Sequence, residues 1–296
     1  MTIFTNADCI LDAVTVHQIT KVSHKTGQEI RKSMNSGGAV IQQVSGKSGV
    51  EVSSLTSADI GTLLAVGTNT FCSVGLYVAA GTVTIPFQVR SQGGLFASGS
   101  NHVAMTGAKA LIVPTTLEAS QDSDFATIGF DIHWLSADGQ AKGCATATGQ
   151  ALATQAFGAE FALGPCYINT TLIAGVQSWR ATFGFEIDKP PLGSGSVFPS
   201  LASIKKVEPT LQITVNDFDS IAGTVGAFTA MTSANCYLRK RLDSGVYSAS
   251  TDNVRLTFAA GLADTDSVDI SNNDDGTATI TLHGKTLTAS AAVAIP

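Results

Sequence analysis

The sequence predicts an all-β protein made of two tandem, related domains, each with one short helix. Several segments alternate polar and apolar residues with a period of two, which is the pattern of a strand that buries one face. Clusters of Gly, Asn, Asp and Ser separate these segments, as turns do. In addition, features of the first half recur in the second half, which indicates two related domains.

The alternating segments are the main evidence for strands. The most regular ones are residues 82–90, 211–215, 253–258 and 277–282. Helical periodicity is poor nearly everywhere, and the best short-helix candidates are residues 56–65 and their proposed counterpart, residues 217–225. Each domain is therefore expected to be a β-structure with one short helix.

The internal repeat places Cys166 157 positions after Cys9, and Gly184 follows Gly27 at the same spacing. Further matches are drawn after a loop of different length: Val50 and Val52 with Leu211 and Ile213, and Ala126–Ile128 with Ala278–Ile280. A period this long indicates tandem domains rather than a solenoid. The boundary is expected within residues 144–156, a linker or an edge strand, which gives domains of residues 1–150 and 151–296.

The composition suits a subunit that buries much of its surface. Hydrophobic residues make up 44% of the chain and charged residues only 14%, against about 25% charged in an average globular protein. A soluble extracellular β-protein would also fit this composition. The net charge is −6, and the basic cluster Arg239–Arg241 is the one that stands out, so attraction to nucleic-acid phosphates is expected to be weak. We interpret that cluster as protecting a strand edge from further pairing or as contacting a neighbouring subunit.

The five cysteines are odd in number and widely spaced, which predicts buried apolar side chains rather than disulfides or a zinc site. The first residues lack the charged and apolar regions of a signal peptide. No apolar run approaches the roughly 20 residues that span a bilayer. The sequence therefore predicts synthesis in the cytoplasm and no association with a membrane.

No catalytic motif is found, whether a nucleophile elbow, a P-loop or a zinc-protease helix. His133, beside Trp134, is interpreted as an ordinary strand residue. The acidic region Asp264–Asp275 is interpreted as a solvated turn between strands, because Leu282 stands where a calcium-binding EF-hand needs glutamate. We therefore expect no enzymatic activity, no cofactor and no metal.

Residues 163–187 resemble the opening strand pair of the tail tube proteins of long-tailed phages, and residues 204–215 resemble the return strands of the same sheet. The resemblance implies a β-sandwich or barrel with a flanking helix. It implies rings of six such domains, stacked into a tube in the virion tail that is assembled in the host cytoplasm. Two fused domains then imply homotrimeric rings. The implied partners are other copies, other tail proteins, and DNA that passes without specific binding through an acidic lumen.

The resemblance also implies a long loop between two early strands that reaches the neighbouring ring. This chain has two such loops, Arg31–Gly38 and Asp188–Ser200. Apolar residues in the loops are the expected anchors, with Met34 alone in the first. The candidate assembly residues are Arg31, Met34, Gly38, Asp188, Pro191, Leu192, Val197 and Phe198.

Other protein classes fit parts of the sequence. A capsid shell or decoration protein with two β-sandwich or jelly-roll domains also forms pseudo-hexameric trimers. An extracellular adhesin with two immunoglobulin-like domains is a further alternative. A glycosidase on a β-scaffold would need two carboxylates facing one cleft, and no sequence feature singles out such a pair.

Overall fold

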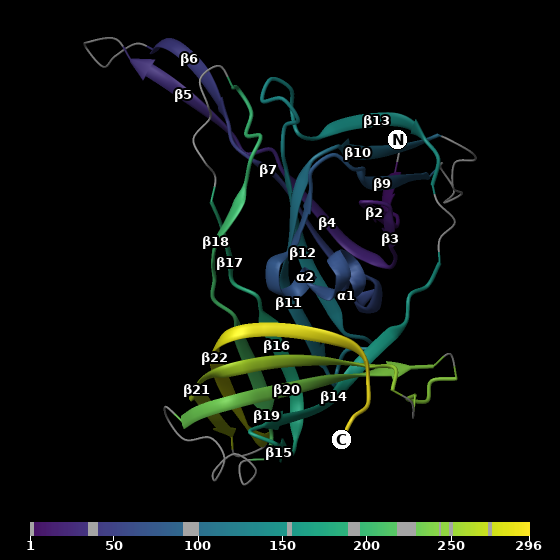
Figure 1. Cartoon of the computed structure of the whole chain (residues 1–296), viewed down its shortest axis with the longest axis vertical. Helices are drawn as coiled ribbons and strands as arrows, with labels where there is room; N and C mark the ends of the chain where they lie inside the picture. The colour runs from purple at the N-terminus through teal and green to yellow at the C-terminus, as the bar shows by residue number, and fades with distance from the viewer. Residues whose placement is uncertain are drawn as a thin grey trace.

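The computed structural model describes residues 3–34, 41–90, 101–152, 156–188, 196–217, 229–242, 244–248, 251–271 and 274–296. Within these residues the chain forms strands β1 to β22 and two short helices, so the all-β prediction is confirmed. The molecule is elongated, with the first half of the chain at one end and the second half at the other (Figure 1).

A six-stranded sheet belongs entirely to the first half. Its strands in spatial order are β13 (Ala145–Gln150), β10 (His102–Gly107), β9 (Val83–Arg90), β2 (Cys9–Leu11) and β3 (Val14–Val16), with β1 (Ile3–Asn6) also paired to β9. The stretch at 144–156 therefore contains an edge strand, one of the two readings that the sequence left open.

A twelve-stranded sheet runs through both halves. Its strands in order are β15 (Thr171–Ile173), β14 (Glu160–Ile168), β20 (Thr229–Arg241), β21 (Asn253–Ser271), β22 (Asp274–Val293), β19 (Thr210–Val215), β16 (Val176–Thr182), β11 (Ala110–Ser120), β12 (Thr127–Trp134), β7 (Glu51–Ser57) and β4 (Ile19–Lys25), with β8 (Leu76–Val78) also paired to β11. Two separate hairpins complete the fold: β5 (Gln28–Met34) with β6 (Ile41–Ser48), and β17 (Phe185–Asp188) with β18 (Ser203–Val207).

The helices lie between β7 and β8. The carboxylate of Asp59 caps α1 (Ile60–Asn69) by accepting a hydrogen bond from the Thr62 N–H, and α2 (Phe71–Val74) follows directly. The sequence placed this helix four residues too early, because β7 continues to Ser57 before the chain turns. The proposed counterpart at 217–225 lies, from residue 218 onward, outside the described residues.

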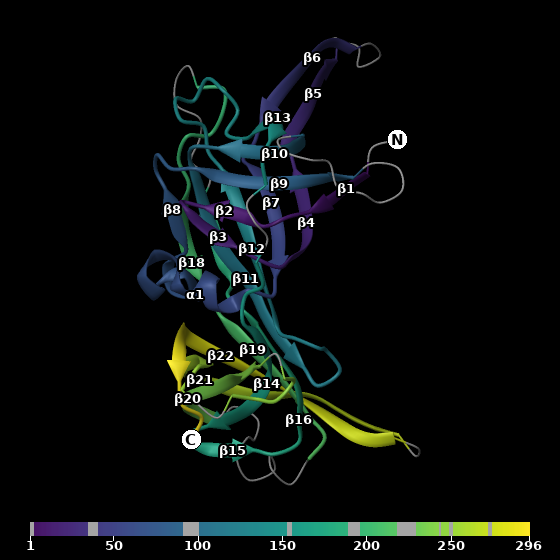
Figure 2. The ribbon, with the colours of Figure 1, turned by 90° about the vertical axis from the view of Figure 1, so that its right-hand side faces the viewer.

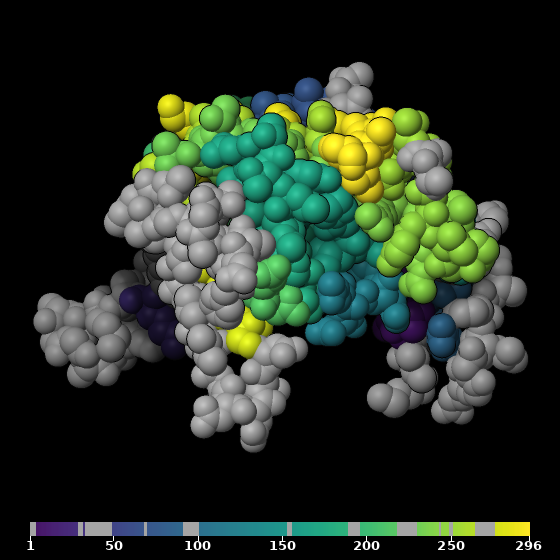
Figure 3. All heavy atoms as spheres, turned by 90° about the horizontal axis from the view of Figure 1, so that it is seen from below, coloured from purple at the N-terminus to yellow at the C-terminus, as the bar shows by residue number. Residues whose placement is uncertain are grey.

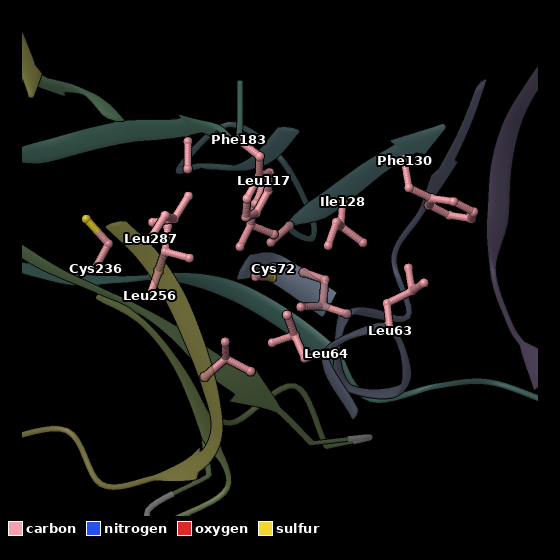
Figure 4. Close-up of a cluster of buried hydrophobic side chains, with 14 of the residues drawn as sticks. Leu63, Leu64, Cys72, Leu117, Ile128, Phe130, Phe183, Cys236, Leu256 and Leu287 are labelled. Carbon is pink, nitrogen blue, oxygen red and sulfur yellow. The ribbon is translucent and has the colours of Figure 1, made fainter. Parts of the chain in front are cut away.

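The main hydrophobic core extends through both halves. Figure 4 shows side chains of α1 and α2 facing side chains of both halves across this core. The labelled residues of this cluster are Leu63, Leu64, Cys72, Leu117, Ile128, Phe130, Phe183, Cys236, Leu256 and Leu287. The core is continuous because β11 of the first half pairs with β16 of the second half.

The two halves repeat the same unusual backbone conformations. Positive φ angles occur at Asp12, Ala13, Gln18 and Gly27, and again 157 positions later at Asn169, Thr170, Gly175 and Gly184. The carbonyl of Gly27 accepts a hydrogen bond from the Gly49 N–H at 2.9 Å, and the carbonyl of Gly184 accepts one from the Glu208 N–H at 3.0 Å. Each glycine therefore lies at the root of a hairpin arm, β5–β6 or β17–β18.

The strand registers repeat as well. The pairing of β4 with β7 is interrupted between Ile19 and Lys21, and the pairing of β16 with β19 is interrupted 157 positions later, between Val176 and Ser178. The pairing of β11 with β12 shifts between Pro114 and Thr116, and that of β21 with β22 shifts 151 positions later, between Thr265 and Ser267. Bulges are specific local distortions, and both halves have them at these strand positions.

These registers correct two of the matches drawn from the sequence. Ile128 lies opposite Ser57, and Ala278 lies opposite Val215, so Ile128 corresponds to Ala278 rather than to Ile280. Val52 likewise corresponds to Thr210 and not to Ile213, because Lys25 and Thr182 lie opposite them. The sequence matches differ from these registers by two residues at Ile128 and by three at Val52, because side-chain alternation alone does not specify which residues pair across strands.

Candidate assembly surfaces

The first hairpin arm, β5–β6, projects from one end of the molecule (Figure 1). Arg31 lies opposite Ser45 and Met34 lies opposite Ile41, so both are strand residues. The predicted loop from Arg31 to Gly38 therefore begins too early, because its first four residues, Arg31 to Met34, belong to strand β5. Gly38 lies outside the described residues.

The second arm, β17–β18, returns to the first half of its own chain. Asp188 ends β17 opposite Ser203, while Pro191 and Leu192 lie outside the described residues. The N–H groups of Val197 and Phe198 donate to the Gly139 carbonyl at 2.8 and 3.0 Å. The side chain of Val197 remains 52% exposed, and that of Phe198 is partly buried. The end of this loop is thus held by a turn of the first half, and its role between rings stays a prediction.

This arm also covers the outer face of β11. The side chains of Leu111 and Val113 point away from the main core, and a second apolar cluster buries them. The arm contributes Phe185, Ile187 and Ile204 to that cluster. Both faces of β11 are therefore covered, one by the main core and one by an arm from the other half.

The contact between β11 and β16 has an apolar face and a charged face. Ala119 lies opposite the fully buried Trp179, which belongs to the core. On the other face Glu118 lies opposite Arg180, and Arg180 Nε is 3.8 Å from Glu118 Oε2. Both charged side chains are about half exposed, so this ion pair contributes at most about 1 kcal/mol. Apolar burial, rather than the ion pair, stabilises this contact.

The twelve-stranded sheet ends at β4, whose outer edge carries exposed Lys21, Ser23 and Lys25. A second edge lies on β21. Its residues 264–271 pair only with β22 in the described part of the chain, whereas residues 254–263 also pair with β20. The region interpreted as a solvated turn is thus mostly strand, because pairing between β21 and β22 extends to Ser271 and Asp274.

The basic cluster Arg239–Arg241 is not at a strand edge, because β20 lies between β14 and β21. Its side chains contact their own chain. Arg241 Nη1 donates to the Asp124 carbonyl at 3.2 Å, Lys240 Nζ lies 3.5 Å from Asp252 Oδ2, and the Arg239 guanidinium lies over the Tyr247 ring. The edge-protecting role predicted for this cluster is therefore wrong.

The surface hollows are open and bounded by mixed side chains. One hollow, about 1100 Å³, is lined by residues 157–160, 240–242, 244 and 245. A smaller one lies between Arg239, Tyr247 and the C-terminal residues, which appear in yellow on the face shown in Figure 3. Among the described residues, no group of three or more His, Cys, Asp or Glu could hold a metal ion.

A histidine–carboxylate pair lies beside the helix start. His17 Nδ1 is 2.7 Å from Asp8 Oδ2, the His17 N–H donates to Asp59 Oδ2 at 3.1 Å, and Ser57 Oγ donates to the His17 carbonyl at 2.7 Å. These bonds tie the β2–β3 hairpin to the end of β7 and the N-terminus of α1. The arrangement is accounted for by this structural role.

All five cysteines are free and buried, as the sequence predicted. Burial raises the pKa of Cys72 and of Cys144 to about 12 and also raises the pKa of Cys9. Cys166 Sγ donates a hydrogen bond to Cys236 Sγ at 3.1 Å. The pKa of Cys236 is raised mainly by burial and, to a smaller extent, by this hydrogen bond. Since the thiolate is the reactive form, these thiols are poor nucleophiles at neutral pH.

We predict that the folded protein does not react with a thiol-specific chromogenic reagent at neutral pH, whereas all five thiols react after denaturation. The measurement is a titration of released chromophore with and without denaturant. Rapid reaction of even one thiol in the folded state would contradict the burial described above.

No known protein family model matches the sequence, and no curated protein sequence matches it. Of the helices that the structure describes, none has the length and apolar character needed to cross a membrane.

Proposed function

We propose that this protein is a virion structural subunit that polymerises into stacked rings, forming a phage tail tube through which DNA passes. The observation that carries the proposal is the continuous sheet, which joins two halves of matching geometry through β11 and β16. A ring forms when each unit makes the same contact with the next unit around the ring. The contact between β11 and β16 is the model for the contact proposed between chains.

The proposal includes an internal duplication, with residues 1–150 and 151–296 as related units. Its support is the recurrence of positive φ angles at a constant spacing and of bulges at corresponding strand positions. In a duplicated chain, the contact between the halves is of the heterologous kind, in which different surfaces of similar units meet. Repeated heterologous contacts generate closed rings when the rotation between units closes.

Three copies per ring would then present six equivalent units, as the resemblance to tail tube proteins implies. The low charged content, 14%, fits extensive burial between subunits. The net charge of −6 fits a lumen that does not retain DNA. On this proposal the protein acts in the virion tail without enzymatic activity, after assembly in the host cytoplasm with other tail proteins.

Electron microscopy of the purified full chain tests the proposal. We expect hollow tubes of stacked rings, with three chains per ring and two similar densities per chain. Closed shells would support the capsid alternative instead, and a protein that stays monomeric at high concentration would support the adhesin alternative. Rings of six full chains would contradict the duplication while leaving a tube intact.

A further inference from the structure

We infer that β4 of one copy pairs antiparallel with residues 267–271 of β21 in the next copy, and that the β5–β6 arm of the first copy covers Leu262 of the second. This inference rests on the proposed self-assembly and specifies its lateral contact. The two surfaces are free strand edges within the described residues, and the partner is a second copy of this chain. Figure 2 shows β21 and β22 extending as a long hairpin beyond the rest of their half.

The internal contact between β11 and β16 supplies the geometry. The shared bulge at Ile19 and Val176 makes β4 the counterpart of β16. The shared bulge after Pro114 and Thr265 makes residues 267–271 the counterpart of residues 116–120 in β11. β4 and residues 267–271 would therefore pair between copies, as β16 and β11 pair within one chain.

Transferring the internal register gives a specific pairing. Thr116 lies opposite Thr182 and Ser120 opposite Ser178 in the internal contact. Adding 151 to each β11 position and subtracting 157 from each β16 position gives the register between copies. The predicted opposite pairs are Ser267 with Lys25, Val268 with His24, Asp269 with Ser23, Ile270 with Val22, and Ser271 with Lys21.

One apolar pair of this register, Ile270 with Val22, fits the internal contact, while Val268 lies opposite His24. Val268 and Ile270 occupy the positions of Leu117 and Ala119, which are buried in the internal contact. There the small Ala119 faces the large Trp179. Between copies two side chains of intermediate size, Ile270 and Val22, would meet, so the combined volume is roughly kept. Complementary volume is what a buried strand contact requires.

The charges also fit. β4 carries Lys21 and Lys25, while β21 carries Asp264, Asp266 and Asp269 in the segment that, among the described residues, pairs only with β22. In the transferred register Asp269 lies opposite Ser23 and diagonal to both lysines, which is within the reach of cross-strand pairs. Pairing either edge with its own kind would place lysine against lysine or aspartate against aspartate. The charges therefore favour the head-to-tail contact over a symmetric one.

Leu262 provides an independent indication. It corresponds to Leu111, which is 4% exposed because the β17–β18 arm covers it, whereas Leu262 is 48% exposed. The β5–β6 arm corresponds to β17–β18 and carries Ile30 at the register position of Ile187. The same arrangement between copies would bring this arm over Leu262. An exposed leucine on a strand is thus explained by the missing neighbour.

Paired cysteine variants test the register. Four single variants, Lys25→Cys, Lys21→Cys, Ser267→Cys and Ser271→Cys, are mixed in pairs under mild oxidation during assembly. We expect disulfide-linked dimers from 25 with 267 and from 21 with 271. The crossed pairs would be separated by roughly 13 Å along the strand, so we expect about tenfold less product from them, because disulfides need Cα atoms within about 7 Å.

The crossed pairs are the matched control, since they contain the same four substitutions and would react only if the strands were parallel or shifted. The buried, unreactive native thiols keep the background low. Tubes that form while only the crossed pairs, or none of the pairs, become linked would overturn this inference and leave the proposed function standing. Failure of the unmodified chain to assemble at all would overturn both.

A second variant tests the arm contact without altering the monomer's core. Leu262→Glu adds a charge where the arm is expected to bind, and the matched control Leu172→Glu changes a leucine that is 52% exposed on β15. We expect Leu262→Glu to abolish tubes while its thermal unfolding midpoint stays at that of the control, which should still assemble. Normal assembly of the Leu262→Glu variant would overturn the arm placement.

Discussion

Trp179→Ala is expected to lower the free energy of unfolding by about 3–5 kcal/mol, the cost of removing a large buried aromatic side chain. Trp179 is 1% exposed and lies on β16 at the contact with β11. Because one core runs through both halves, we expect the loss to affect a single transition of the whole chain. Urea denaturation followed by far-ultraviolet circular dichroism measures it without relying on the removed fluorophore.

Trp179→Phe is the control for this change. The indole N–H is buried and has no hydrogen-bond partner among the described residues, so phenylalanine removes a costly polar group while it keeps most of the volume. We expect a loss below about 1.5 kcal/mol. If the alanine variant were no less stable than the phenylalanine variant, or if only one half unfolded early, the continuous core would not be the unit of stability.

Gly184→Ala is expected to destabilise the protein by about 3 kcal/mol or more, from a strained backbone and a direct clash. Gly184 has a φ of 63°, and an added Cβ would lie 2.0 Å from the Glu208 carbonyl oxygen. The neighbouring atom is backbone at the root of the β17–β18 arm, so it cannot move aside without breaking the pairing there. Chemical denaturation gives the loss of stability.

Gly245→Ala separates these two causes. Its φ is 78°, but nothing lies within 4 Å of an added Cβ, so only the backbone strain of about 1 kcal/mol applies. Gly27→Ala, where the Val50 carbonyl oxygen lies 2.5 Å from the added Cβ, should resemble Gly184→Ala. Equal losses at positions 184 and 245 would show that the contact with Glu208 contributes nothing.

The alternation of side chains was sufficient to predict strands at several places. The segments at 82–90, 211–215 and 253–258 match β9, β19 and the start of β21. Period-two alternation is a local consequence of burying one face, and a single sequence carries it. Gly27 and Gly184, matched from the sequence at a spacing of 157, both have positive φ angles, while the duplication itself stays a prediction.

The sequence indicated which residues of the second loop make a contact, but it did not indicate what they contact. Val197 and Phe198 stood out as apolar residues in a loop rich in Gly, Ser and Pro, which indicates a contact. That their N–H groups bind Gly139 of the same chain depends on how the two halves meet, which no local pattern contains. The signal from Leu262 was missed because an exposed leucine on an alternating strand looks like any core residue until its neighbours are known.

The sequence by itself determined the all-β class and several approximate strands, because these depend on side-chain periodicity and on turn residues. The tertiary structure alone decided the registers, the bulges and the pairing of β11 with β16. Strand pairing joins residues far apart in the chain, and a shift of two residues keeps the same alternation. Only the packed core, with Trp179 against Ala119 and the arm over Leu111, distinguishes one register from the next.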